Sequence, residues 1–147
     1  PGRPPWQTKK QKQNAAREAA DNNDRKIIEE AQNQPRLMCE ESNCSGIERT
    51  MIDQAKALTA DMLRDPESAR FRSIFVTSGY ADEGVTVCGL IQGRNGFGGY
   101  AQRKVFSFDG TRAQIAPSKD CTIDSSAVNK AREAQKRIEK RSLEFQS

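Results

Sequence analysis

The 147-residue chain is long enough for one domain with a hydrophobic core, yet only 35% of its residues are hydrophobic and 30% are charged. This polarity excludes a chain folded uniformly around one large core, and it predicts a compact unit of about a hundred residues with polar ends. The formal charge of +4 is not gathered in any one segment, and no stretch approaches the roughly 20 apolar residues of a membrane span.

The first 38 residues read as a polar arm that is helical or partly disordered. Thr8 is a suitable N-cap for a helix that runs to about Asn33. Its only large apolar residues are the neighbours Ile27 and Ile28, so the helix lacks an apolar face and needs a partner to be stable. The polar cluster at residues 21–24 is a candidate interruption.

The four cysteines suggest two disulfides and an oxidising compartment. A zinc site is less favoured because the chain has no histidine and Cys88 and Cys121 are isolated. Three pairings can be drawn. We favour Cys39–Cys44 as a local loop within a tight turn, and Cys88–Cys121 as a bridge between the sheet and the last helix.

An amphipathic helix is expected from Ser45 or Gly46 to about residue 64. Glu48 is placed to complete a capping box with Ser45. Apolar residues recur at spacings of three and four, which is typical of a helix laid across a sheet. This stripe contains Ile47, Met51, Ile52, Ala55, Leu58, Met62 and Leu63.

Four strands follow, at residues 71–78, 85–92, 99–108 and 111–116. Their connections are short, and Asp109-Gly110 is a strong hairpin signal. Short connections favour an antiparallel meander over parallel βαβ units. The predicted fold is therefore α+β, with a four-stranded antiparallel meander packed by the amphipathic helix.

The chain is expected to end in a helix capped by Asp124 or Ser125 and running to about Leu143. It has a narrow apolar stripe and many basic residues, which glutamates dilute. We therefore interpret it as a solvated helix and do not expect it to bind nucleic acid. The stripe contains Val128, Ala131, Gln135 and Ile138.

A glycine-rich loop at residues 93–100 is the most unusual segment. It matches neither the dinucleotide-binding fingerprint nor the phosphate-binding loop. Two interpretations stay open. Either the glycines serve a tight connection that needs positive φ, or they expose a surface that a partner contacts. The candidate contact residues are Arg94, Asn95, Phe97, Gly98, Gly99 and Tyr100.

No catalytic constellation is visible. The commonest general base is missing because there is no histidine. Acidic residues with catalytic potential all lie in expected turns, where carboxylates are ordinary, and the thiols are expected to be bonded. These acidic residues are Asp82, Glu83, Asp109 and Asp120. We name no catalytic residue, cofactor or metal ligand.

Three short motifs stand out in the middle of the chain: Leu63-x-Asp65-Pro66-x-Ser68-Ala69-x-Phe71-Arg72, Val87-Cys88-Gly89 and Asn95-x-Phe97-Gly98-Gly99-Tyr100. Together they resemble a family of small exported bacterial proteins without an assigned activity, some lipoprotein-like and some found in phage or mobile-element neighbourhoods. The resemblance covers about residues 58–121 and implies an exported α+β domain in which Cys121 pairs with the cysteine of the second motif. The family offers no catalytic residues to carry over.

The sequence thus predicts an arm at residues 1–38 and a disulfide-bonded domain at residues 39–147. We expect a non-catalytic binding or assembly component of the bacterial envelope or extracellular space, with a protein partner or inhibitory role. The alternatives are a small envelope hydrolase and a phage or mobile-element accessory protein that binds nucleic acid. A partner would contact the glycine loop or the arm, where Trp6, the only tryptophan, is the candidate anchor.

The sequence leaves the oligomeric state and the partner's identity open. It contains no recognisable secretion signal, but it begins at Pro1 instead of methionine. A preceding signal or lipoprotein segment that has been removed is compatible with this start, as is a trimmed chain.

Overall fold

The computed structural model describes residues 8–146, which divide into two compact units. One unit is formed by residues 33–123, and the other by the two helical ends of the chain, up to Gln32 and from Asp124. The sequence analysis grouped the C-terminal helix with the sheet, whereas its contacts group it with the N-terminal helix.

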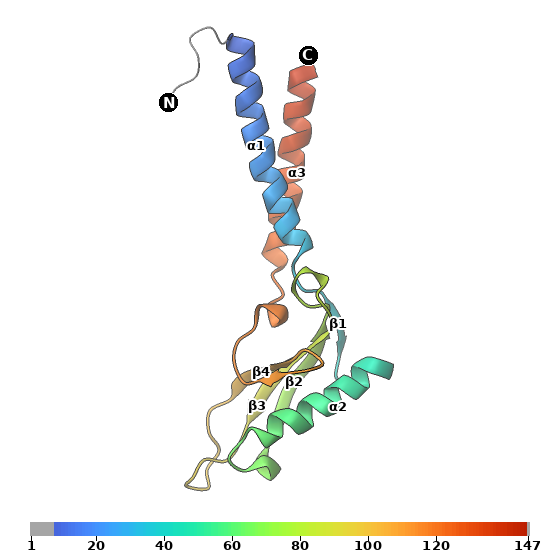
Figure 1. Cartoon of the computed structure of the whole chain (residues 1–147), viewed down its shortest axis with the longest axis vertical. Coiled ribbons are helices and arrows are strands. Elements are labelled where there is room, and N and C mark those ends of the chain that lie inside the picture. The colour runs from blue at the N-terminus through green and yellow to red at the C-terminus, as the bar shows by residue number, and fades with distance from the viewer. Residues whose placement is uncertain (1–7, 147) are drawn as a thin grey trace. The chain divides into compact units, whose positions relative to one another are not determined.

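The unit of residues 33–123 contains a fully antiparallel five-stranded sheet (Figure 1). The spatial order of the strands follows the sequence, so the predicted meander is confirmed. The prediction of four strands was wrong by one edge strand. The strands are β1 (Leu37–Glu40), β2 (Arg70–Thr77), β3 (Thr86–Gln92), β4 (Lys104–Phe108) and β5 (Ala113–Gln114).

Two predicted strands are shorter than expected. The strand expected at residues 99–108 begins only at Lys104, and Tyr100 forms an isolated bridge with Arg94 instead. The last strand is reduced to β5. The turn between β4 and β5 forms as predicted, since Asp109 Oδ1 accepts hydrogen bonds from the backbone N–H groups of Thr111 and Arg112, at 2.8 and 2.7 Å.

Helix α2 (Gly46–Asp61) covers one face of the sheet (Figure 1). Its buried residues are Ile52, Ala55 and Thr59, one turn apart along the helix. The predicted stripe was therefore partly wrong, because Ile47 and Leu58 are exposed, and the Ser45 side chain makes no capping hydrogen bond. The strand residues of this core are Ile74, Val76, Val87, Ile91, Phe106 and Phe108.

Both disulfides have the pairing that the sequence analysis favoured, Cys39–Cys44 and Cys88–Cys121. The second joins β3 to the 3₁₀ turn η3 (Lys119–Cys121). It therefore fastens the segment that precedes the last helix and not that helix itself. We call residues 116–123, which follow β5 and contain η3, the strap.

The second unit consists of α1 (Lys9–Gln32) and α3 (Ser125–Gln146), which lie side by side (Figure 1). The N-caps predicted for these two helices form. The Thr8 hydroxyl accepts a hydrogen bond from Gln11 N, and Asp124 Oδ1 accepts one from Ser126 N. Among the described residues, neither helix is long and apolar enough to cross a membrane.

A buried aspartate lies where α1 and α3 meet. Asp24 is only 3% exposed and accepts hydrogen bonds from Arg137 and Arg141, while Asp21 accepts one from Arg141. The polar cluster at residues 21–24 therefore does not interrupt α1. The predicted stripe of α3 was also partly wrong, because Val128 is exposed, and the fully buried residue of this helix is Ala134.

Candidate ligand-binding face

The glycine-rich loop is a hairpin extension beyond β3, with a defined backbone. Ala101 N donates to Gly93 O at 2.8 Å, and Asn95 N donates to Gly99 O at 2.7 Å. The Asn95 side chain accepts a hydrogen bond from Phe97 N at 2.9 Å, which closes the tip. Asn95 therefore shapes the turn, and its Oδ1 is already engaged within it.

The glycines of this loop are needed for different reasons. Gly98 has a φ of +83°, which L side chains rarely adopt. A Cβ on Gly93 would lie 2.8 Å from Leu63 Cδ1, so the Leu63 side chain would have to shift to make room for it. Gly99 has neither constraint, since a Cβ there would meet only Asn95 at van der Waals distance. The loop thus has a structural need for some of its glycines but not for all of them.

Phe97 lies at the tip of this hairpin and is 99% exposed. It is therefore no core residue of the described structure. A fully exposed phenylalanine at a fixed turn leaves a large apolar side chain in water, as contact residues at protein interfaces do before binding.

Tyr100 organises two arginines at the base of the loop. The Cζ atom of Arg70 lies 3.6 Å from the centroid of the Tyr100 ring, and that of Arg94 lies 5.8 Å from it. The backbone N–H of Arg94 also donates to the Ser68 hydroxyl at 2.9 Å. Tyr100 is half-buried, so its role is to position Arg70 and Arg94.

The sheet face opposite α2 has a basic groove of about 330 Å³. It is lined by Arg70, Arg72 and Arg103 beside Leu90 and Gln92. Within residues 8–146, no carboxylate lies within 4.0 Å of the guanidinium groups of these three arginines or of Arg94. The groove therefore presents positive charge that no carboxylate of residues 8–146 neutralises.

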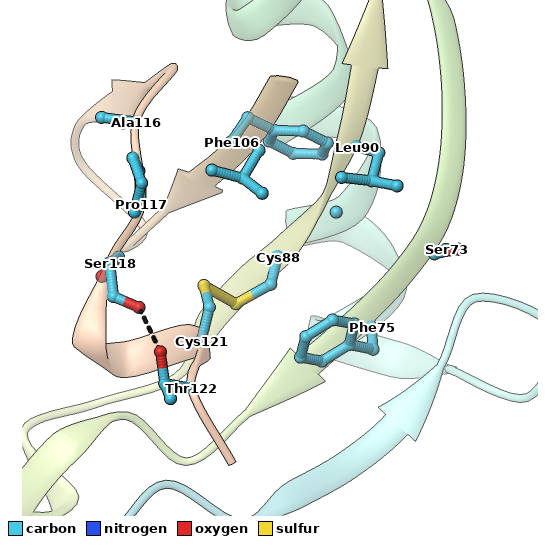
Figure 2. Close-up of a pocket in the computed structure, with 12 residues that line it drawn as sticks. Ser73, Phe75, Cys88, Leu90, Phe106, Ala116, Pro117, Ser118, Cys121 and Thr122 are labelled. Atoms are coloured by element: carbon cyan, nitrogen blue, oxygen red, sulfur yellow. Dashed lines mark hydrogen bonds between the residues drawn. A yellow bond between two sulfur atoms is a disulfide. The ribbon is translucent and has the colours of Figure 1, made fainter. Parts of the chain in front are cut away.

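An apolar pocket of about 370 Å³ lies on the same face (Figure 2). Phe75 and Leu90 form its floor, and Pro117 and the disulfide partner Cys121 of the strap form its wall. Val105 also lines the pocket. Leu90 lines both the pocket and the basic groove. The two cavities are thus neighbours on one continuous surface.

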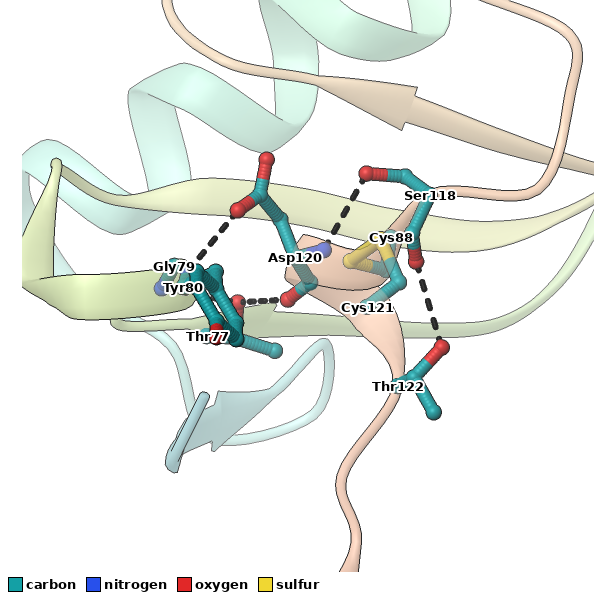
Figure 3. The surroundings of a disulfide bond; sticks show 8 residues. All are labelled: Thr77, Gly79, Tyr80, Cys88, Ser118, Asp120, Cys121 and Thr122. Carbon is teal, nitrogen blue, oxygen red and sulfur yellow. Dashed lines mark hydrogen bonds between the residues drawn. A yellow bond between two sulfur atoms is a disulfide. The ribbon is translucent and has the colours of Figure 1, made fainter. Parts of the chain in front are cut away.

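The strap that forms this wall is fixed by more than its disulfide (Figure 3). The Thr77 hydroxyl donates to Asp120 O at 2.7 Å, and Tyr80 N donates to Asp120 Oδ1 at 2.8 Å. Asp120 N in turn donates to the Ser118 hydroxyl at 3.2 Å. Asp120, considered above for catalysis, therefore has a structural role here.

Two other acidic residues considered for catalysis also have structural contacts. Asp82 pairs with Arg36 at 3.2 Å. The backbone N–H groups of Arg112 and Thr111 lower the pKa of Asp109 below its ordinary value, because they stabilise the carboxylate. No group of three or more potential ligands in the described part of the chain could hold a metal ion.

Of the residues proposed from the sequence, the structure brings Arg94 and Tyr100 together and places Phe97 at the tip of the same hairpin. Trp6 lies outside the described residues. Sequence reasoning missed Arg70, Arg72 and Arg103. The alternation of Arg70 and Arg72 around Phe71 was the available signal, since alternate residues of a strand share a face.

Comparison with protein-family models, with curated protein sequences and with solved structures found no match. The resemblance to small exported bacterial proteins therefore stays a prediction.

Proposed function

We propose that this protein is a non-catalytic binding or assembly component that acts outside the cytoplasm and engages a protein partner through the glycine-rich loop. The observation that carries the proposal is Phe97, 99% exposed on a turn whose backbone is held by Asn95 and Gly98. A phenylalanine has only two side-chain torsions to fix, so on a turn with a held backbone it loses little conformational entropy on binding and contributes efficiently to an interface.

The two disulfides support the proposal that the protein is exported. All four cysteines are paired in two disulfides, a pattern typical of periplasmic and extracellular proteins. The disulfide-bonded part also contains the proposed contact loop. Together with the resemblance to exported proteins, this favours the envelope or the extracellular space as the place of action.

Nucleic-acid binding is a second candidate, favoured by the arginines of the basic groove, whose charge is not neutralised by any carboxylate in the described part of the chain. Phosphate contacts release counterions, so such binding weakens steeply as salt rises. Binding to single-stranded and duplex DNA should therefore be titrated at roughly 50 and 200 mM salt, where several phosphate contacts predict a loss of about a thousandfold.

Site-specific photo-cross-linking tests the main proposal. A benzophenone amino acid is placed at position 97, and, as a matched control, at Leu58, which is exposed on α2. Each protein is irradiated with the envelope and extracellular fractions of the producing cells. We expect a discrete adduct from position 97 only, abolished by an excess of unlabelled wild-type protein.

Two further variants separate recognition from folding. Phe97→Ala and Arg94→Ala should reduce formation of the complex with the cross-linked partner, while the melting temperature stays within about 2 °C of wild type because both side chains are exposed. Equal adducts from positions 97 and 58, or undiminished binding by Phe97→Ala, would refute the role of the loop.

A further inference from the structure

The basic groove and the apolar pocket follow one strand. Cys88, Leu90 and Gln92 alternate along β3 and share a face, with Cys88 in the pocket, Gln92 in the groove and Leu90 in both. At about 3.3 Å per residue, the distance from Cys88 to Gln92 along the strand is about 13 Å. An extended polypeptide covers that length with about four residues.

A β-bulge in β2 brings the arginines of the groove and the phenylalanine of the apolar pocket onto the same face of the sheet. Arg72 pairs with Leu90 and Phe75 pairs with Cys88, so two residues of β2 stand opposite one residue of β3. In a regular strand, Arg72 and Phe75 would face opposite sides of the sheet because they are three positions apart. Ser73, within the bulge and lining the pocket, has a φ of 54°, an uncommon conformation for a serine.

This geometry points to an occupant with a defined chemistry. We propose that the face opposite α2 binds an extended acidic polypeptide segment, with an apolar side chain in the pocket and carboxylates on Arg70, Arg72 and Arg103. The inference deepens the proposed protein-binding function and rests on it. It adds the chemical class of the partner segment and a second contact surface beside the loop.

Charge and shape together favour this occupant. Three guanidinium groups line the groove and a fourth, that of Arg94, lies at the Tyr100 ring, so the site suits several negative charges and not a single carboxylate. The neighbouring pocket has aliphatic and aromatic walls suited to an aliphatic side chain. A nucleic acid could place phosphates on the arginines, but it has no aliphatic side chain for the apolar pocket beside them.

A fluorescence-anisotropy titration of the full chain tests the inference. The probe is a labelled peptide of two leucines followed by four glutamates. Its matched controls carry glutamines in place of the glutamates, or alanines in place of the leucines. We expect the glutamate peptide to bind at least about tenfold more tightly than the glutamine peptide, with an affinity that falls as salt rises. The alanine peptide should bind about threefold to tenfold more weakly.

Variants assign the binding to the groove. Arg72→Gln and Arg103→Gln should each weaken binding of the glutamate peptide by about three- to tenfold, because each removes one partly exposed charge contact. Arg132→Gln, which removes an exposed arginine of α3, is the control and should change nothing. Phe97→Ala should also leave this affinity unchanged, so failure of the groove and failure of the loop are separate results.

Several results would overturn the inference. These are equal binding of the glutamate and glutamine peptides, no binding of either peptide, or an equal loss in Arg72→Gln and Arg132→Gln. An oligothymidylate that binds more tightly than the glutamate peptide and loses affinity in Arg72→Gln would assign the groove to nucleic acid. A third outcome is that dodecanoate displaces the peptide and that the alanine peptide binds as well as the leucine peptide. That outcome would assign the apolar pocket to a small amphiphile.

Discussion

Removal of the two disulfides should have unequal effects, because they close chain loops of very different length. The separations are 33 residues for Cys88–Cys121 and 5 residues for Cys39–Cys44. The chain-entropy model then gives a stabilisation of about 3.7 kcal/mol for the first and about 2.1 kcal/mol for the second. The difference of about 1.6 kcal/mol corresponds to a shift in melting temperature of roughly 6–13 °C.

Native contacts also predict that Cys88–Cys121 stabilises the fold more than Cys39–Cys44 does. Without its bridge, the Cys39–Cys44 turn keeps the hydrogen bonds from Asn43 N and Cys44 N to Glu40 O and from Glu40 N to the Asn43 side chain. When Cys121 is freed from the buried Cys88, the strap keeps its contacts through Asp120 and the contact of Lys119 with the Tyr80 ring. Loss of the long bridge should therefore also loosen one wall of the apolar pocket.

The assay compares Cys88→Ala/Cys121→Ala with Cys39→Ala/Cys44→Ala by thermal unfolding without reductant, followed by circular dichroism. Hydrogen exchange of the Cys121 and Thr122 positions, whose amides bond within the strap, reports its local opening. The larger stabilising effect of Cys88–Cys121 is refuted if the Cys39→Ala/Cys44→Ala protein melts at as low a temperature as the Cys88→Ala/Cys121→Ala protein. Free thiols in the wild-type protein, or a Cys39–Cys121 link in non-reducing peptide mapping, would refute the pairing itself.

Three further predictions concern the loop, the bulge and the helix pair. Gly98→Ala should lower the free energy of unfolding by about 1 kcal/mol because its φ is positive, whereas Gly99→Ala should be nearly neutral; equal losses in chemical denaturation would contradict this. Ser73→Gly should raise the free energy of unfolding by up to about 1 kcal/mol because glycine adopts a positive φ without strain. A lower free energy of unfolding in this variant would contradict the strain assigned to Ser73. Hydrogen bonds from Arg137 and Arg141 lower the pKa of Asp24 below 3.8. The stability that Asp24 adds to the helix pair should therefore persist above about pH 4 and be lost as pH falls through the lowered pKa. The helicity of Asp24→Asn should lack this acid-induced loss, and identical pH curves for the two proteins would refute the role of the ion pairs.

Much of the sheet unit could be predicted from local chemistry. Turn residues such as Asp109 and the apolar run of β3 define the meander, and cysteine number and spacing favour both disulfides. The edge strand β1 was missed because it is only four residues long and lies against the Cys39–Cys44 turn, which dominated the interpretation. The burial pattern of α2 also depends on the sheet that it covers. Ile47 falls on the helical stripe but has nothing to pack against.

The helix pair and the basic groove could not be predicted because both depend on long-range geometry. Contacts of Asp24 with Arg137 and Arg141 join positions more than a hundred residues apart, and they involve charged residues, which apolar periodicity ignores. In the groove, a one-residue bulge decides which side chains share a face. The strand pattern alone therefore assigns Arg72 and Phe75 to opposite sides.

The proposed binding of an acidic partner segment to the face opposite α2 is tested most directly by mapping where such a segment binds. The ¹⁵N-labelled full chain is titrated with the leucine–glutamate peptide, and backbone amide shifts are followed by NMR. We expect the largest shifts at residues 70–75, 88–92 and 103–105, which border the groove and the pocket. The glutamine peptide should leave these shifts nearly unchanged. Shifts confined to α1 and α3, or equal shifts with both peptides, would contradict the claim that the face opposite α2 is the binding surface.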